Sequence, residues 1–171
     1  MPAIYAAVLT MILCVADLAS SSIPFDVPSG AYKMAASTSF VATAWLAGAK
    51  QTLYGKILLA GLIFSWWGDY FLIGGSQGRF LAGLVSFFLA HVAYCAAYYV
   101  RGTDMYLTAS TGAVLILPAL FLGPWIWPGV PVELRVPVVA YLIVISAMVA
   151  LAVGTWGQPG SVLIIAGALL F

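Results

Sequence analysis

The stretch Gly61–Ile73, with the sequence GLIFSWWGDYFLI, decides how the rest of this chain is interpreted. It has the apolar character of a membrane helix, yet it contains the carboxylate of Asp69. A charged side chain near the centre of a membrane-spanning helix costs roughly 2.5 to 3.5 kcal/mol on insertion scales. Carboxylates inside membrane helices mark functional sites, so Asp69 is the first candidate for a functional group.

The composition of the whole chain is that of a membrane protein. Of its 171 residues, 64% are hydrophobic and only 6% are charged, which excludes a soluble domain of ordinary composition. The stretches between the apolar runs are short, so we expect one transmembrane domain over residues 1–171. A net charge of +1 provides no basic surface for nucleic acid. We therefore predict an integral, multi-pass membrane protein, and the short loops and lack of signal-peptide features suit a bacterial inner membrane.

Apolar runs of membrane-helix length divide the chain into about seven segments. We expect an all-α transmembrane bundle with segments at 3–21, 33–49, 53–73, 80–100, 106–122, 134–153 and from 161 onward. The last run reaches Phe171 after about half the length of a span, so we expect the chain to be truncated at its C-terminus. Trp125 and Trp127 fall in the predicted turn between the fifth and sixth segments, where an interfacial aromatic belt would lie.

Two segments carry chemically useful residues on one face. Gly61, Ser65 and Asp69 recur every four residues and therefore share one side of the third segment. In the fourth segment, spacings of three and four residues form a second stripe of Phe80, Gly83, Phe87, His91, Tyr94 and Tyr98. Small residues leave room, aromatic rings form an apolar wall and titratable groups supply chemistry. The two stripes predict a pocket between helices.

Asp69 has two predicted partners, Lys33 and Arg79, because all three lie toward the same end of the predicted bundle. His91 lies nearer the middle of its segment, so contact with Asp69 is not implied. A structural interpretation competes at each position. Asp69 would then be an interfacial ion pair, and His91 a hydrogen-bonded packing residue.

These residues resemble the YhhN family of integral membrane proteins, whose characterised members are lysoplasmalogenases. The resemblance covers nearly the whole chain and rests on Lys33, on the run Gly61–Leu72 with Ser65 and Asp69, on Phe80, Gly83, Phe88, His91 and Tyr94, and on Tyr141 and Met148. It implies a bundle of eight helices and a second aspartate beyond the final run GALLF.

The resemblance implies hydrolysis of the vinyl ether bond of a lysoplasmalogen, a single-chain ether lysophospholipid, to a fatty aldehyde and a glycerophospho-alcohol. Cleavage needs an acid that protonates the enol-ether carbon and a carboxylate that stabilises the resulting cation or directs water. We expect Asp69, as general acid or base, and His91 to be catalytic. The expected substrate-binding residues are Lys33, Ser65, Arg79, Phe87, Tyr94 and Tyr141. No metal ion or other cofactor is expected.

Two alternatives stay open. A lipid-binding or lipid-transport protein needs the same apolar pocket with a cationic rim but breaks no bond. A purely structural interpretation treats the polar groups as links between helices, and on that interpretation Tyr141 belongs to the packed core of the sixth segment. The expected partners in any of these functions are the lipid ligand and the surrounding membrane lipids.

Overall fold

The computed structural model of the chain describes residues 30–170 and, further upstream, Ile12. The predicted first segment, residues 3–21, lies outside the described residues apart from Ile12. The same holds for the loop after it, up to Gly30. The predictions that follow are therefore compared with the structure from Gly30 onward.

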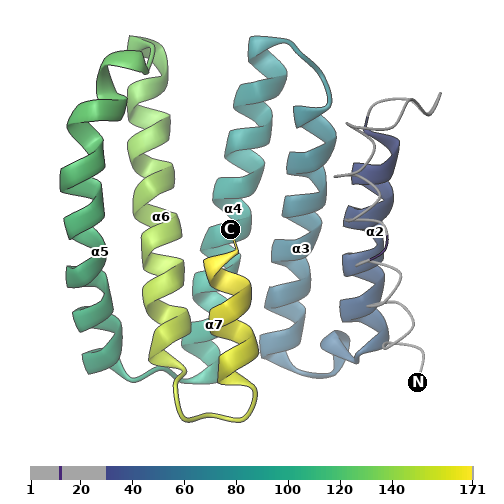
Figure 1. The fold of residues 1–171 in the computed structure, drawn as a ribbon. Helices are drawn as coiled ribbons and strands as arrows, with labels where there is room; N and C mark the ends of the chain where they lie inside the picture. Colours follow the sequence, from purple (N-terminus) through teal and green to yellow (C-terminus); the bar gives the residue numbers. More distant parts are fainter. Residues whose placement is uncertain (1–11, 13–29, 171) are drawn as a thin grey trace. The chain divides into compact units, whose positions relative to one another are not determined.

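The described residues form helices and connecting turns, with no strand among them (Figure 1). The α-helices are α2 (Ala31–Leu46), α3 (Leu53–Leu72), α4 (Gln77–Arg101), α5 (Met105–Ile126), α6 (Arg135–Gly154) and α7 (Ser161–Leu169). Short 3-10 helices accompany them at η1 (Ala49–Gln51), η2 (Trp127–Gly129) and η3 (Val132–Leu134). The predicted all-α fold is confirmed for this part of the chain.

Within the described part of the chain, three helical stretches are long and apolar enough to cross a membrane. They are Gln77–Arg101, Met105–Gly129 and Val132–Gly154. Helix α2 has 16 residues and α7 has 9, fewer than the 17 or so that a span needs. Helix α3 has 20 residues but carries Lys56 and Asp69, and it is not among the three. The structure thus supports a membrane protein, but it does not confirm seven spans.

The predicted helix ends lie close to the observed ones, with the largest difference in α5. The prediction ended this helix at residue 122 because Gly123 and Pro124 resemble a turn, whereas α5 continues to Ile126. That boundary is wrong because Pro124 lies inside the helix, and the Trp127 N–H still donates to the Gly123 carbonyl and closes the last turn. Proline is tolerated in membrane helices, where other groups compensate for its missing N–H.

Side-chain caps begin two of the helices. The Thr52 hydroxyl accepts a hydrogen bond of 3.0 Å from the Gly55 N–H at the start of α3. The Asp104 carboxylate accepts bonds of 2.8 and 3.0 Å from the N–H groups of Tyr106 and Leu107 at the start of α5. Each cap contributes about 1 kcal/mol to helix stability. The caps explain why predicted and observed helices begin within a residue of each other at these two places.

Contacts divide the chain into two compact units, residues 1–93 and 94–171, and each is described by itself. In the second unit, α6 packs against both α5 and α7. The Asp104 N–H donates to the Gly154 carbonyl at 2.8 Å. Side-chain donors on Arg101 and Gln158 bond the backbone carbonyls of Pro159 and Gly102. These bonds tie the connection before α5 to the connection before α7.

In the first unit, α2 and α3 lie side by side (Figure 1), and α3 approaches α4 at two glycines. A Cβ atom on Gly68 would lie 2.6 Å from Cε2 of Phe87. A Cβ atom on Gly83 would lie 2.9 Å from Cδ2 of Leu72. Carbon atoms in contact normally stay about 3.5 to 4.0 Å apart. The two helices can pack this closely only because both positions are glycine.

We predict that Gly68→Ala destabilises the protein, because its new methyl group would displace the Phe87 ring. Overpacking of this kind costs about 1 to 3 kcal/mol. The matched control is Gly78→Ala in α4, where a Cβ atom would meet nothing within 4 Å. Thermal unfolding of both variants in detergent measures the difference. Equal melting temperatures for the two variants would contradict the close packing at Gly68.

Candidate active site

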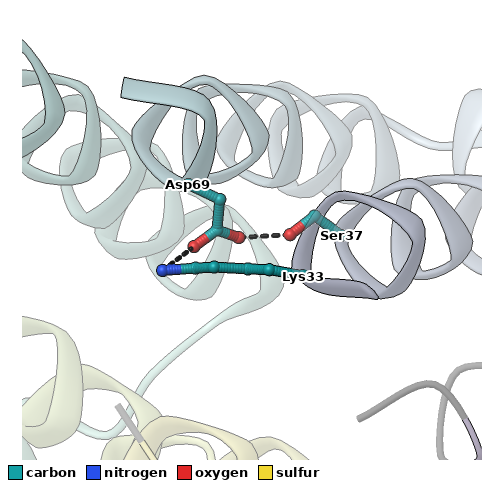
Figure 2. A network of polar contacts seen from close by, with 3 residues as sticks. All are labelled: Lys33, Ser37 and Asp69. Atoms are coloured by element: carbon teal, nitrogen blue, oxygen red, sulfur yellow. Dashed lines mark hydrogen bonds and ion pairs between the residues drawn. The ribbon is translucent and has the colours of Figure 1, made fainter. Parts of the chain in front are cut away.

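Asp69 lies in the last turn of α3, and both of its carboxylate oxygens contact residues of α2 (Figure 2). The Lys33 ammonium is 3.3 Å from Oδ1, and the Ser37 hydroxyl donates a hydrogen bond to Oδ2. The Asp69 side chain is only 15% exposed, whereas that of Lys33 is 38% exposed. Ser37 is buried. These three residues form what we call the Lys33–Ser37–Asp69 cluster.

The local sequence explains why these groups meet. Lys33 and Ser37 are four residues apart, so they lie on one face of α2. On α3, Gly61, Ser65 and Gly68 are buried and short. Small residues of this kind let two membrane helices approach closely. A short serine side chain on α2 can therefore reach a carboxylate on α3.

A second hydrogen bond joins the same two helices and sets their register. The indole N–H of Trp66 donates to the Thr38 hydroxyl oxygen at 3.0 Å. The Thr38 hydroxyl in turn donates to the Met34 carbonyl at 2.7 Å, which fixes its orientation on α2. Trp66 also stacks on Tyr70, with ring centres 6.2 Å apart and planes nearly parallel. These contacts hold α2 and α3 at the height where the cluster forms.

Both groups that contact Asp69 can interact favourably with a carboxylate. The ammonium of Lys33 forms an ion pair with it, and the hydroxyl of Ser37 donates a hydrogen bond to it. The sequence leaves acid and base open as roles for Asp69, and either role stays a prediction.

Arg79 contacts Tyr70. Its Nη2 lies 3.5 Å from the Tyr70 carbonyl oxygen, and its guanidinium carbon lies 5.4 Å from the centre of the Tyr70 ring. The side chain also crosses Gly74, where a Cβ atom would collide with it. Of the two predicted partners of Asp69, the structure therefore selects Lys33. A role of Arg79 in substrate binding stays a prediction.

Phe87 and His91 lie one turn apart on α4. The Phe87 ring packs against Gly68, directly beside Asp69 in the sequence. His91 is completely buried, and its Nδ1 is 2.5 Å from the Phe87 carbonyl oxygen. Because a carbonyl only accepts hydrogen bonds, Nδ1 carries a proton in this contact. Joint action of His91 with Asp69 stays a prediction.

The other predicted site residues divide between the two units. Ser65 is buried one turn before Asp69 on α3. Tyr94 is buried on α4 and Tyr141 is half-buried on α6, and both belong to the second unit. Their part in a site with Asp69 stays a prediction. Within residues 30–170, no group of three or more His, Cys, Asp or Glu side chains is placed to hold a metal ion.

Ser37 is the site residue that the sequence prediction misses. It lies in a segment rich in alanine, serine and threonine, which indicates close helix packing. The available signal was its spacing, because Ser37 follows the predicted ion-pair partner Lys33 by four residues. Any group on that face of α2 could reach the same partner as Lys33.

The comparisons with known proteins agree with the predicted resemblance. The model of the YhhN family matches residues 29–171, a range that includes α2 to α7 and the whole Lys33–Ser37–Asp69 cluster. The resemblance inferred from the residues is thereby confirmed. No solved structure matches the chain.

We predict that Lys33 and Asp69 stabilise the fold cooperatively. In a double-mutant cycle with Lys33→Met and Asp69→Asn, the coupling energy should be about 1 kcal/mol, because residues in contact are not additive. Lys56→Met is the control, since Lys56 lies thirteen positions from Asp69 on α3, roughly 20 Å along the helix. The free energy of unfolding of each variant in detergent gives the coupling energy of both cycles. If the effects of Lys33→Met and Asp69→Asn simply add, the ion pair is refuted.

Proposed function

The chain belongs to the YhhN family, and on this premise we propose that it is a hydrolase of the lysoplasmalogenase type, embedded as a multi-pass protein in a bacterial inner membrane. The proposed substrate is a lysoplasmalogen, a single-chain ether lysophospholipid. Its vinyl ether bond is hydrolysed to a fatty aldehyde and a glycerophospho-alcohol. The observation that carries this proposal is the Asp69 carboxylate, held by Lys33 and Ser37 between two apolar helices.

The proposed reaction has three proton-dependent steps. An acid first protonates the enol-ether carbon that is not bonded to oxygen, and the neighbouring carbon becomes part of a positively charged oxocarbenium ion. Water then adds to that carbon and loses a proton to a base, which gives a hemiacetal. In the last step the hemiacetal hydroxyl loses its proton, the glycerol oxygen gains one, and the bond between the carbon and that oxygen breaks to release aldehyde and alcohol. A fixed negative charge near the cation and a base near the water would accelerate these steps.

Asp69 is suited to the second step. Its ionised carboxylate would stabilise the oxocarbenium ion and accept the proton of the attacking water. The Ser37 hydroxyl and the Lys33 ammonium would hold it in one orientation, which is the preorganisation that favours charge stabilisation. The first step needs a proton donor, and in this proposal His91, which belongs to the same unit as Asp69, donates or relays that proton.

The cations near the cluster would bind the phosphate of the substrate. Lys33 keeps part of its side chain exposed, and Arg79 lies next to Gly74 at the α3–α4 turn. A hollow at this turn is lined by Leu72, Gly74, Gly75, Ser76, Gln77 and Phe80. Its backbone and polar side chains suit a head group, and the apolar helix faces suit the alkenyl chain, which would enter sideways from the bilayer.

A lipid-binding or lipid-transport function remains the alternative proposal, because an apolar site with cations at its rim would also hold a lipid without breaking it. The two functions differ in what they require of Asp69. Transport needs no proton transfer at Asp69, whereas hydrolysis needs its ability to accept a proton. Lipid movement that survives Asp69→Asn, without release of aldehyde from the parent protein, would favour transport.

We predict that Asp69→Asn lowers aldehyde release from a lysoplasmalogen by at least about 100-fold, because the amide cannot accept a proton and carries no charge. The matched control is Asp104→Asn, since asparagine caps a helix about as well as aspartate. Aldehyde production by both purified variants in detergent micelles measures the effect. Unchanged turnover with Asp69→Asn would exclude Asp69 from the reaction.

We further predict that Ser37→Ala lowers kcat about 10- to 100-fold with little change in KM, since it removes one hydrogen bond to a charged group, worth about 1.5 to 3 kcal/mol. Ser39→Ala is the control. Ser39 is also buried on α2, but its hydroxyl bonds the Ala35 carbonyl of its own helix at 2.8 Å. Equal kcat values for the two variants would show that Ser37 does not position Asp69.

A further inference from the structure

The second unit contains an apolar groove between α5 and α6, with a volume of about 250 Å³. Both of these helices are long and apolar enough to cross a membrane, so the groove runs along a part of the second unit that suits hydrocarbon. Its volume is below the roughly 300 to 1,000 Å³ of pockets for bulky small molecules, which suits one narrow chain. The lining includes Leu115, Pro118, Leu122, Trp127, Leu142 and Ser146.

One end of this groove carries a cation. Trp127 and Val130 line that end, and Arg135 contacts both of them. The guanidinium carbon lies 5.2 Å from the centre of the Trp127 ring, and Nε donates to the Val130 carbonyl at 3.4 Å. These contacts involve the face of the Trp127 ring and use one of the five N–H donors of Arg135. The two terminal nitrogens form the planar fork that binds phosphate oxygens.

The length of the groove matches one leaflet of a bilayer. The lining residues of α5 run from Leu115 to Ile126, eleven positions that correspond to about 16 Å along the helix. One leaflet contributes about half of a hydrocarbon core that is roughly 30 Å thick. Trp127, at the cationic end, is of the residue type that concentrates at the membrane–water interface. A lipid with its phosphate at Arg135 would therefore place its acyl chain along the whole groove.

We propose that this groove binds one acyl chain of a membrane phospholipid whose head group carries an ammonium beside the phosphate. Arg135 binds the phosphate. Glu133, two residues earlier in η3, supplies a carboxylate that suits the ammonium and opposes a head group with net negative charge. This site uses none of the residues of the Lys33–Ser37–Asp69 cluster, so it stands independently of the proposed hydrolysis.

The test is a titration of phosphatidylethanolamine or phosphatidylglycerol into the delipidated 171-residue protein, with bound lipid counted by native mass spectrometry. Arg135→Gln should weaken binding of phosphatidylethanolamine about tenfold, because it removes charge-assisted hydrogen bonds to the phosphate. Phosphatidylglycerol should bind the parent protein more weakly than phosphatidylethanolamine does. Lys50→Gln is the matched control, since the Lys50 ammonium lies over the Trp45 ring at 4.8 Å in the first unit.

A second pair of variants tests the groove itself. Ala119→Phe places a ring among the lining residues, whereas Ala113→Phe adds the same ring at another exposed position of α5 that does not line the groove. Only Ala119→Phe should reduce lipid binding. Equal binding by Arg135→Gln, Ala119→Phe and the parent protein would overturn the proposal. So would an Ala119→Cys variant that forms a cross-linked dimer through this position, which would make a second copy the occupant.

Discussion

The ion pair between Lys33 and Asp69 is the interaction on which the first unit depends. Asp69 is the group of α3 that tolerates hydrocarbon least, and its partner has to come from outside its own helical face. Helix α2 supplies a cation and a hydroxyl four residues apart, so one face satisfies both carboxylate oxygens. This pairing determines which side of α2 meets α3 and at what height.

Such a short-range cluster is feasible only where helices come close together. The serine side chain is short, so the Ser37 contact requires a close approach of α2 to α3, and α3 has small, buried residues at Gly61 and Ser65. Gly68 meets the same requirement toward α4, where the Phe87 ring occupies the space of a side chain. The small residues that precede Asp69 therefore allow neighbouring helices to pack closely against α3. The Asp69 carboxylate lies next to these closely packed positions.

Periodicity and turn residues predict much of this fold because they act locally. The start of α3 at Leu53 follows from the cap at Thr52, and its end at Leu72 precedes the glycine pair that the sequence shows. The end of α5 was predicted too early, because Pro124 has the same local signal in a turn and in a membrane helix. Sequence rules that consider only neighbouring residues cannot distinguish a proline in a turn from a proline in a membrane helix, because the difference lies in the surrounding structure.

The sequence predicted those parts of the candidate site that depend on which residues share one face of a helix. The spacing of Ser65 and Asp69 placed both residues on one side of α3, and the predicted polar end of the bundle reduced the partners of Asp69 to two cations. The choice between them depends on tertiary contacts, because Arg79 is drawn to the Tyr70 ring and carbonyl. Ser37 was missed for the opposite reason, since a serine among alanines indicates packing unless its partner is known.

The dependence of Asp69 on α2 also has a consequence for membrane insertion. Helix α3 alone would bring a bare carboxylate into the bilayer, at a cost of up to about 3 kcal/mol near its centre. Helix α2 alone, with 16 residues, extends about 24 Å and is shorter than the hydrocarbon core. The short connection through η1 joins α2 and α3 into a helical hairpin in which Lys33 and Asp69 are already paired. Entry of residues 31–72 into a bilayer as one hairpin would therefore avoid the cost of an unpaired carboxylate.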